Sequence, residues 1–199
     1  NINKIVTIDK STIKLLKENE GSIIMTGHLG NWEYFLPILG LNDIKFSIVA
    51  QTIKNSYLNT LFLKNRSFEN VQIIFRNEGT EKMIEALKNK FHLGLASDQN
   101  AGRKGTIVNF LNDKISIPKG AAIFHIKTKK PIYIGYCIMN KKYNYEFAIE
   151  LLDTSKINLK KSDCIKKINN KFARSLEQRI KKYPNQYFWF HKMKNKTKY

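Results

Sequence analysis

The stretch "SIIMTGHLGNWEYFLPILG", residues 22–40, changes its pattern in the middle and determines how the rest of the chain is interpreted. Its first part, residues 22–26, is an apolar run with the length and composition of a buried strand. His28 follows between two glycines, which allow a tight or left-handed turn. Asn31 is a good helix cap, and the residues after it predict a short helix over residues 31–40. The stretch therefore predicts a strand, a turn that carries a histidine, and a helix in direct succession.

Apolar and amphipathic segments keep alternating along the rest of the chain. The further expected strands span residues 45–50, 71–75, 92–96, 131–139 and 143–151. The further expected helices span residues 55–66, 80–90 (with Thr80 as the cap), 118–128 and 162–182. Strands that alternate with helices indicate an α/β fold with a mostly parallel, mixed sheet flanked by helices. The last two strands predict an antiparallel hairpin near residues 131–151.

Length and composition set the class of protein. The chain has 199 residues, of which 42% are hydrophobic, and this is enough for a single domain over residues 1–199 with a sizeable core. Its two cysteines, Cys137 and Cys164, form no cluster with metal-ligand spacing, so we predict neither a metal nor a cofactor. No apolar run approaches the length that spans a bilayer, so we expect the chain as given to lie on a membrane rather than cross it.

The charge of the chain predicts acidic partners. The formal net charge is +19, which would attract anionic lipid, an acidic carrier protein or nucleic acid. Only five of the 35 basic residues are arginine. Each arginine is therefore a candidate for a role that needs the planar guanidinium group and its several hydrogen-bond donors. Arg66, Arg76 and Arg103 lie near the residues discussed below, whereas Arg174 and Arg179 are expected on a helix surface.

His28 and Glu33 are expected to form a site at the strand-to-helix junction. On one continuous helix, a spacing of five residues would place them about 140° apart. They can approach each other only if His28 lies in the turn and Glu33 in the first helical turn, where free N–H groups also favour an anion. We expect His28 to take a proton from an attacking hydroxyl and Glu33 to bind or orient the acceptor. The remaining histidines, His92, His125 and His191, favour structural roles.

The motif "GHLGNWE", residues 27–33, resembles the His-x4-Asp/Glu signature of the glycerolipid acyltransferase superfamily. More narrowly, it is similar to the late acyltransferases of lipid A biosynthesis, the lauroyl/myristoyl transferase group. Later segments agree in order: "VAQTIKNSYLNTLFLKNR" ending at Arg66, the Asp-Gln block "GLASDQNAGRKG" at residues 94–105, and the closing "YPNQYFWFHKMKNKTK" at residues 183–198. The resemblance covers residues 22–196 and implies a glycerolipid-acyltransferase-like fold.

The resemblance implies transfer of a fatty acyl chain from acyl carrier protein to a hydroxyl of a lipid A precursor. His28 would be the general base, and Arg66 would assist turn or helix N–H groups at the oxyanion or bind a substrate phosphate. Asp98 is the candidate to orient His28, with a loop-capping role as the alternative. The predicted substrate-binding set also contains Asn31, Gln99, Arg103 and Lys104, the last three of which could equally belong to a solvated loop.

The expected partners are acyl carrier protein, a lipid A precursor and an anionic membrane surface, with no nucleic acid. The similar family has a longer N-terminal region with a membrane-anchoring helix, which we expect this chain to lack, leaving it peripheral at the cytoplasmic face of the bacterial inner membrane. Residues 187–190 are aromatic and four lysines follow within residues 192–198, a composition that suits a membrane interface. Two alternatives remain, a basic nucleic-acid-binding protein and a thioester or ester hydrolase with the same His–acid site.

Overall fold

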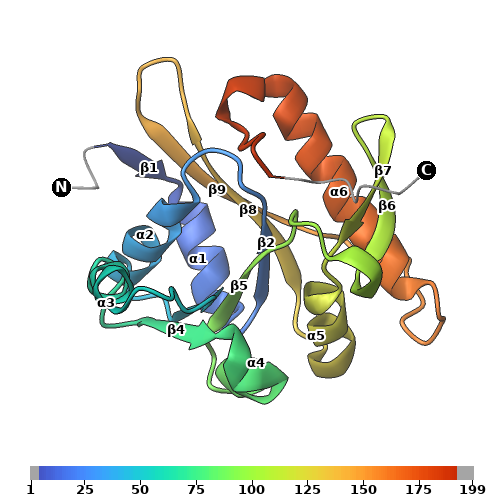
Figure 1. Cartoon of the computed structure of the whole chain (residues 1–199), viewed down its shortest axis with the longest axis horizontal. Helices are drawn as coiled ribbons and strands as arrows, with labels where there is room; N and C mark the ends of the chain where they lie inside the picture. Colours follow the sequence, from blue (N-terminus) through green and yellow to red (C-terminus); the bar gives the residue numbers. More distant parts are fainter. Residues whose placement is uncertain (1–4, 192–199) are drawn as a thin grey trace.

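The computed structural model describes residues 5–191 of the chain. Within this part, seven strands form one sheet in the order β1-β9-β8-β2-β5-β3-β4 (Figure 1). These strands are β1 (Val6–Ile8), β2 (Ile23–Thr26), β3 (Phe46–Ala50), β4 (Val71–Phe75), β5 (His92–Ala96), β8 (Ile132–Met139) and β9 (Tyr145–Leu151). Neighbouring strands are parallel except for the antiparallel pair β8 and β9. The predicted mostly parallel sheet and its hairpin are therefore confirmed.

Helices cover both faces of this sheet (Figure 1). The α-helices of the described part are α1 (Lys10–Glu18), α2 (Phe35–Leu41), α3 (Ser56–Lys64), α4 (Gly79–Lys88), α5 (Gly120–Thr128) and α6 (Cys164–Lys182). α1 and α2 share one apolar core with the sheet, while α4, α5 and α6 share the other. A two-stranded hairpin of β6 (Thr106–Phe110) and β7 (Asp113–Ile117) packs into the second core, beside α6.

The central strand β2 shows why the apolar run at residues 23–25 is continuous. Ile23 and Met25 point into the core under α4, α5 and α6, whereas Ile24 points into the core under α1 and α2. All three side chains are fully buried. β2 lies in the middle of the sheet, between β8 and β5, so both of its faces are covered. A strand covered on both faces needs apolar residues at every position, which explains the continuous run.

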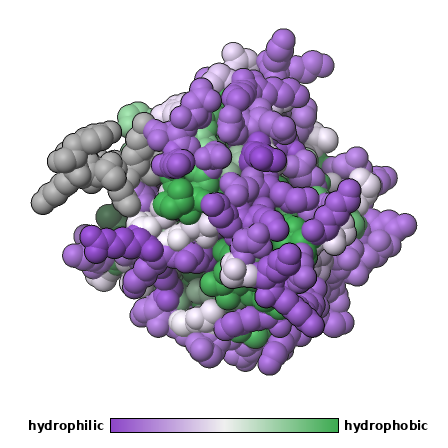
Figure 2. All heavy atoms as spheres, turned by 90° about the vertical axis from the view of Figure 1, so that its right-hand side faces the viewer, coloured by the Kyte–Doolittle hydropathy of each residue, from purple (hydrophilic) through white to green (hydrophobic). Residues whose placement is uncertain are grey.

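Hydrophilic side chains cover most of the face that carries α6 and the β6–β7 hairpin (Figure 2). Along α6, Ile168, Phe172 and Leu176 are buried at helical spacing, as the sequence predicts. Lys167 and Lys171, on the other side of the helix, are exposed. These two lysines therefore lie on the solvated face of the helix.

The helix predicted over residues 31–40 is wrong at its start. Residues Trp32–Tyr34 form a 3-10 turn, α2 begins only at Phe35, and the Asn31 side chain makes no capping bond. Pro37 explains the delay, because proline has no N–H and is tolerated in an α-helix only within the first turn. The Asn31 N–H instead donates to the Cys137 carbonyl at 2.8 Å, which ties this turn to β8.

The other boundaries differ by one or two residues, and the first two elements along the chain were not predicted. α4 begins at Gly79, so Thr80 lies inside its first turn and does not cap it. α5 begins at Gly120 and α6 at Cys164, each two residues after the predicted start. The two elements that were not predicted are β1 and α1. β1 gives little signal because it has only three residues and its place in the sheet depends on distant β9.

Buried His92 at the start of β5 has the structural role that was expected. Its Nδ1 lies 2.6 Å from the Ser22 hydroxyl, and desolvation lowers its pKa from 6.5 to about 4, although a bond to the Leu16 backbone opposes this. Above pH 6.5 the ring is neutral in both the folded and the unfolded chain. Between pH 6.5 and 4 only the unfolded chain takes up this proton, so acid favours unfolding in that interval.

We therefore predict that His92 makes the free energy of unfolding fall by up to about 3 kcal/mol as the pH decreases from 6.5 to 4. His92→Gln removes this titration, so its stability should depend less on pH over the same interval. Urea unfolding at several pH values measures both slopes. Equal slopes for the two proteins would contradict the assignment.

Candidate active site

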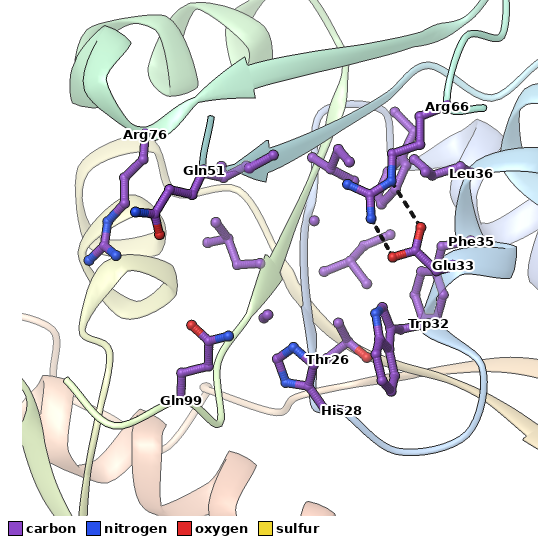
Figure 3. A pocket seen from close by; sticks show the side chains of 18 of the residues that line it. Thr26, His28, Trp32, Glu33, Phe35, Leu36, Gln51, Arg66, Arg76 and Gln99 are labelled. Atoms are coloured by element: carbon purple, nitrogen blue, oxygen red, sulfur yellow. Dashed lines mark hydrogen bonds and ion pairs between the residues drawn. The ribbon is translucent and has the colours of Figure 1, made fainter. Parts of the chain in front are cut away.

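A cavity of about 390 Å³ opens where β2, β3 and β5 end (Figure 3). Most of its lining residues are apolar, and seven polar side chains also line it. The apolar lining includes Ile24, Phe35, Leu36, Phe46, Ile48, Phe62 and Leu95. The polar lining includes Thr26, His28, Glu33, Gln51, Arg66, Arg76 and Gln99. The cavity lies at the carboxyl ends of parallel strands, where open α/β sheets bind their ligands.

His28 and Asp98 form the central pair of this site. The His28 Nδ1 lies 2.7 Å from one oxygen of the Asp98 carboxylate, and the His28 backbone N–H donates to the other oxygen at 2.7 Å. The Asp98 side chain is completely buried, whereas 12% of the His28 side chain is exposed. Because a carboxylate only accepts hydrogen bonds, Nδ1 carries a proton, and Nε2 of the neutral ring is left to accept one.

The parallel pairing of β2 with β5 brings this pair together. Thr26 at the end of β2 is in register with Ala96 at the end of β5, so the residues that follow both strands leave the sheet at the same edge. Gly27 leaves room for the carboxylate, since a Cβ there would lie 3.1 Å from the Asp98 Oδ2. Asp98 thus lies against the His28 ring, and its catalytic role of orienting that ring stays a prediction.

Gly30 completes the turn after His28. Its φ is +68°, a backbone conformation that glycine adopts without strain, and a Cβ there would lie 2.0 Å from the Cys137 carbonyl oxygen. Its N–H donates to the Gln186 carbonyl at 2.9 Å. The turn is thus fixed from two sides, by β8 and by the C-terminal segment.

The C-terminal segment, residues 183–191, forms part of the site, which the sequence did not predict. The Tyr187 hydroxyl donates to the Asp98 Oδ2 at 3.3 Å. Burial and the nearby Asp98 charge raise the pKa of Tyr187, so this hydroxyl stays protonated and able to donate. The Phe188 N–H donates to the His28 carbonyl at 2.9 Å. The signal for this segment in the sequence is its closing aromatic motif, which supports the family resemblance and whose composition also suits a membrane interface.

Aromatic rings surround the His28 imidazole. Trp32 meets it edge-on at 4.8 Å between ring centroids, and His191 does so at 4.5 Å. Phe188 lies further away, at 6.4 Å. Burial, and then the proximity of His28, lower the pKa of His191. These rings restrict the orientation of His28. The lysines at residues 192–198, which belong to the predicted membrane interface, lie outside the described residues.

Glu33 does not contact His28 but pairs with Arg66 across the cavity rim (Figure 3). The Arg66 Nε donates to one Glu33 oxygen at 2.9 Å, and its Nη2 donates to the other. The guanidinium also stacks on the Phe62 ring, with its carbon 3.4 Å from the ring centroid. Glu33 therefore holds Arg66 in position, and any contact of its own with an acceptor remains a prediction.

The other predicted binding residues divide into two groups. Gln99 lines the cavity, as do Gln51 and Arg76, which the predicted binding set did not contain. Asn31, Arg103 and Lys104 are not among the lining residues. The last two lie in an exposed 3-10 turn, Gly102–Lys104. This turn follows the strand end by several residues, so the Asp-Gln block brings only its first members to the cavity.

Two features are absent from residues 5–191, a metal-binding cluster and a membrane-spanning helix. No group of three or more His, Cys, Asp or Glu side chains there is arranged to hold a metal ion. In the same part of the chain, no helix combines the length and the apolar character needed to cross a bilayer.

A histidine backed by a buried carboxylate, beside an apolar cavity and an arginine, defines a site suited to attack on an acyl group. The chain belongs to the bacterial lipid A biosynthesis acyltransferase family, whose sequence pattern matches residues 2–195. Membership of this family supports an acyltransferase function. A comparison with curated protein sequences finds no match.

The contact between His28 and Asp98 predicts the tautomer of the neutral imidazole. Free histidine can carry its proton on either nitrogen, but a carboxylate at Nδ1 requires the proton there. Nitrogen NMR of the wild-type protein, recorded with the His28 ring neutral, should show a protonated Nδ1 and an unprotonated Nε2.

Asp98→Asn provides the control for this measurement. An amide can donate to Nδ1, so the variant should shift the ring toward the Nε2–H tautomer. A wild-type spectrum with the proton on Nε2 would contradict the arrangement.

Proposed function

We propose that this protein transfers a fatty acyl chain from acyl carrier protein to a hydroxyl of a lipid A precursor, with His28 as the general base. The observation that carries the proposal is the His28–Asp98 pair at the edge of an apolar cavity. The family match adds support, because its description names lipid A biosynthesis. On this proposal, residues 1–199 form one acyltransferase domain.

The proposed reaction needs no acyl-enzyme. The Nε2 of His28 takes the proton of the acceptor hydroxyl while the oxygen attacks the thioester carbonyl. The tetrahedral intermediate collapses, the carbon–sulfur bond breaks, and the carrier thiolate takes the proton from the imidazolium. Asp98 stabilises the imidazolium in between and keeps the ring oriented, as the buried aspartate of a catalytic triad does.

Arg66 is the proposed donor to the oxyanion. A guanidinium has five N–H donors, and Glu33 accepts only two of those on Arg66. Arg66 lines the cavity that contains the reacting carbonyl on this proposal, so its remaining donors would serve the oxyanion there. Backbone donors can assist, since Trp32 and Glu33 begin the 3-10 turn and their N–H groups have no backbone partner in the described part.

The apolar cavity walls suit the acyl chain. Side chains from β2, β3 and α2 form a lining without charge, including Ile24, Ile48 and Leu36. Burying hydrocarbon there removes it from water and contributes about 25 cal/mol for each Å² of apolar surface. The thioester carbonyl would then lie at the polar rim, next to His28.

Exposed apolar side chains on two sides of the cavity support a membrane surface as a partner. Leu58 and Leu61 are exposed on α3, whose Phe62 lines the cavity. Trp189 and Phe190 are exposed in the C-terminal segment that packs on His28. With a net charge of +19, such a surface favours an anionic bilayer, and we propose that the protein acts at the cytoplasmic face of the inner membrane.

We predict that His28→Ala lowers acceptor-dependent acyl transfer by at least about 10²-fold, because the general base is lost. The assay combines purified protein, acyl carrier proteins that carry chains of several lengths, and a lipid A precursor. An unchanged thermal midpoint shows that the variant is folded. Wild-type turnover by a folded His28→Ala protein would refute the mechanism.

The same assay separates transfer from hydrolysis. A transferase forms product only when the acceptor is present, whereas a hydrolase releases free fatty acid at the same rate without it. A rate of thioester cleavage that is the same with and without the acceptor would favour the hydrolase alternative.

We also predict that salt weakens the binding of acyl carrier protein. The screening length falls from about 10 Å at 0.1 M salt to about 3 Å at 1 M, and attraction between a basic surface and an acidic carrier falls with it. The Kd should rise about tenfold or more over this range. A circular dichroism spectrum at each salt concentration controls for folding, and a constant Kd would contradict the role of the charge.

A further inference from the structure

The cavity has a second cationic side that the mechanism above does not use. Arg76 and Gln51 lie across the cavity from Arg66 and Glu33 (Figure 3). They come from the ends of neighbouring strands, since Gln51 follows β3 and Arg76 follows β4, and these strands pair in parallel up to Ala50 and Phe75. The pairing therefore brings both side chains to the same edge of the sheet, at the cavity.

The two arginines of the cavity differ in their electrostatic state. The Arg66 charge is compensated by Glu33, which accepts two of its N–H groups. Arg76 forms no ion pair with any residue of the described part. Glu78, the nearest acid along the chain, pairs with Lys82 and accepts the Phe75 N–H, so it is already occupied. Arg76 thus brings a net positive charge to the cavity rim.

The surroundings of Arg76 provide further polar groups and open space. A second hollow, of about 440 Å³, adjoins the cavity and is lined by Gln51, Thr52, Arg76 and Asn77. Gln51 and Arg76 line both spaces and so connect them. The lining of the hollow therefore offers a guanidinium, two side-chain amides and a hydroxyl, and no carboxylate. This set of donors without a negative group matches a phosphate, which accepts several hydrogen bonds and bears charge.

We propose that Arg76 and Gln51 bind a phosphate ester of a substrate, on the side of the cavity away from Arg66. The inference rests on the proposed function, because both the prosthetic arm of the donor and the acceptor headgroup carry phosphate. A substrate held there would span the cavity, with its phosphate at Arg76 and its reacting group at His28. The planar guanidinium of Arg76 can form two parallel hydrogen bonds to two phosphate oxygens, a fixed geometry that a lysine ammonium does not provide.

A binding experiment tests the subsite without any acyl transfer. The probes are glucosamine 1-phosphate and neutral glucosamine, titrated into wild-type protein and followed by NMR. Arg76→Gln should weaken binding of the phosphorylated sugar about 10- to 100-fold and leave the neutral sugar unaffected. Arg174→Gln, which removes the same charge from an exposed position on α6 and away from the cavity, is the matched control and should bind like the wild type.

Steady-state kinetics then identifies the source of the phosphate. A higher KM for the lipid acceptor in Arg76→Gln, with kcat little changed, places the acceptor phosphate at Arg76. A higher KM for the acyl carrier protein places the phosphate of its prosthetic arm there. Arg76→Lys should recover only part of either loss, because it restores the charge without the planar guanidinium.

The proposal is overturned if Arg76→Gln matches Arg174→Gln in phosphate binding and in both KM values while its thermal midpoint is unchanged. A failure of the proposed function looks different. In that case the wild-type protein forms no acceptor-dependent product, yet the sugar phosphate still binds in a manner that depends on Arg76.

Discussion

The arrangement of the site depends on one buried carboxylate. Asp98 is fully enclosed and accepts hydrogen bonds from the His28 ring, the His28 backbone and the Tyr187 hydroxyl. Burying a carboxylate without such partners would cost several kcal/mol, so the donors must be held in place by the fold. A different part of the structure fixes each donor. The side-chain rotamer fixes the His28 ring, the turn after β2 fixes the His28 backbone N–H, and the C-terminal segment fixes the Tyr187 hydroxyl.

This requirement explains why distant parts of the chain meet at residues 27–30. Gln186 donates to the Met139 carbonyl at 2.7 Å and accepts from the Met139 N–H at 2.8 Å, which fixes the C-terminal segment to β8. That segment then positions Tyr187 over Asp98. The glycine positions of the turn let β8 and the carboxylate approach the backbone closely. The rigidity of His28 is thus a property of the sheet, the turn and the C-terminal segment together.

The sequence predicted what depends on local pattern and missed what depends on distant contacts. The run at residues 22–26 identified a buried strand because burial on both faces leaves an unbroken apolar signature. Asp98 was placed correctly because it follows a strand parallel to β2. Glu33 was paired with the wrong partner: spacing alone suggested His28, whereas its true partner, Arg66, lies 33 residues away. Tyr187 carried no local signal of its bond to Asp98, which joins residues 89 apart in sequence.

The two arginines of the cavity suggest how one site can bind a permanent anion and also stabilise a negative charge that forms during the reaction. A guanidinium already paired with a carboxylate attracts a second anion weakly at long range, but it still offers directed donors at short range. Arg66 is in this state, which suits an oxyanion that forms only when the reacting carbonyl is in place. An uncompensated guanidinium attracts a permanent anion before the reaction begins. Arg76 is in this second state. On the proposed function, the separation of the two across the cavity would let a charged substrate bind without occupying the donors that the transition state needs.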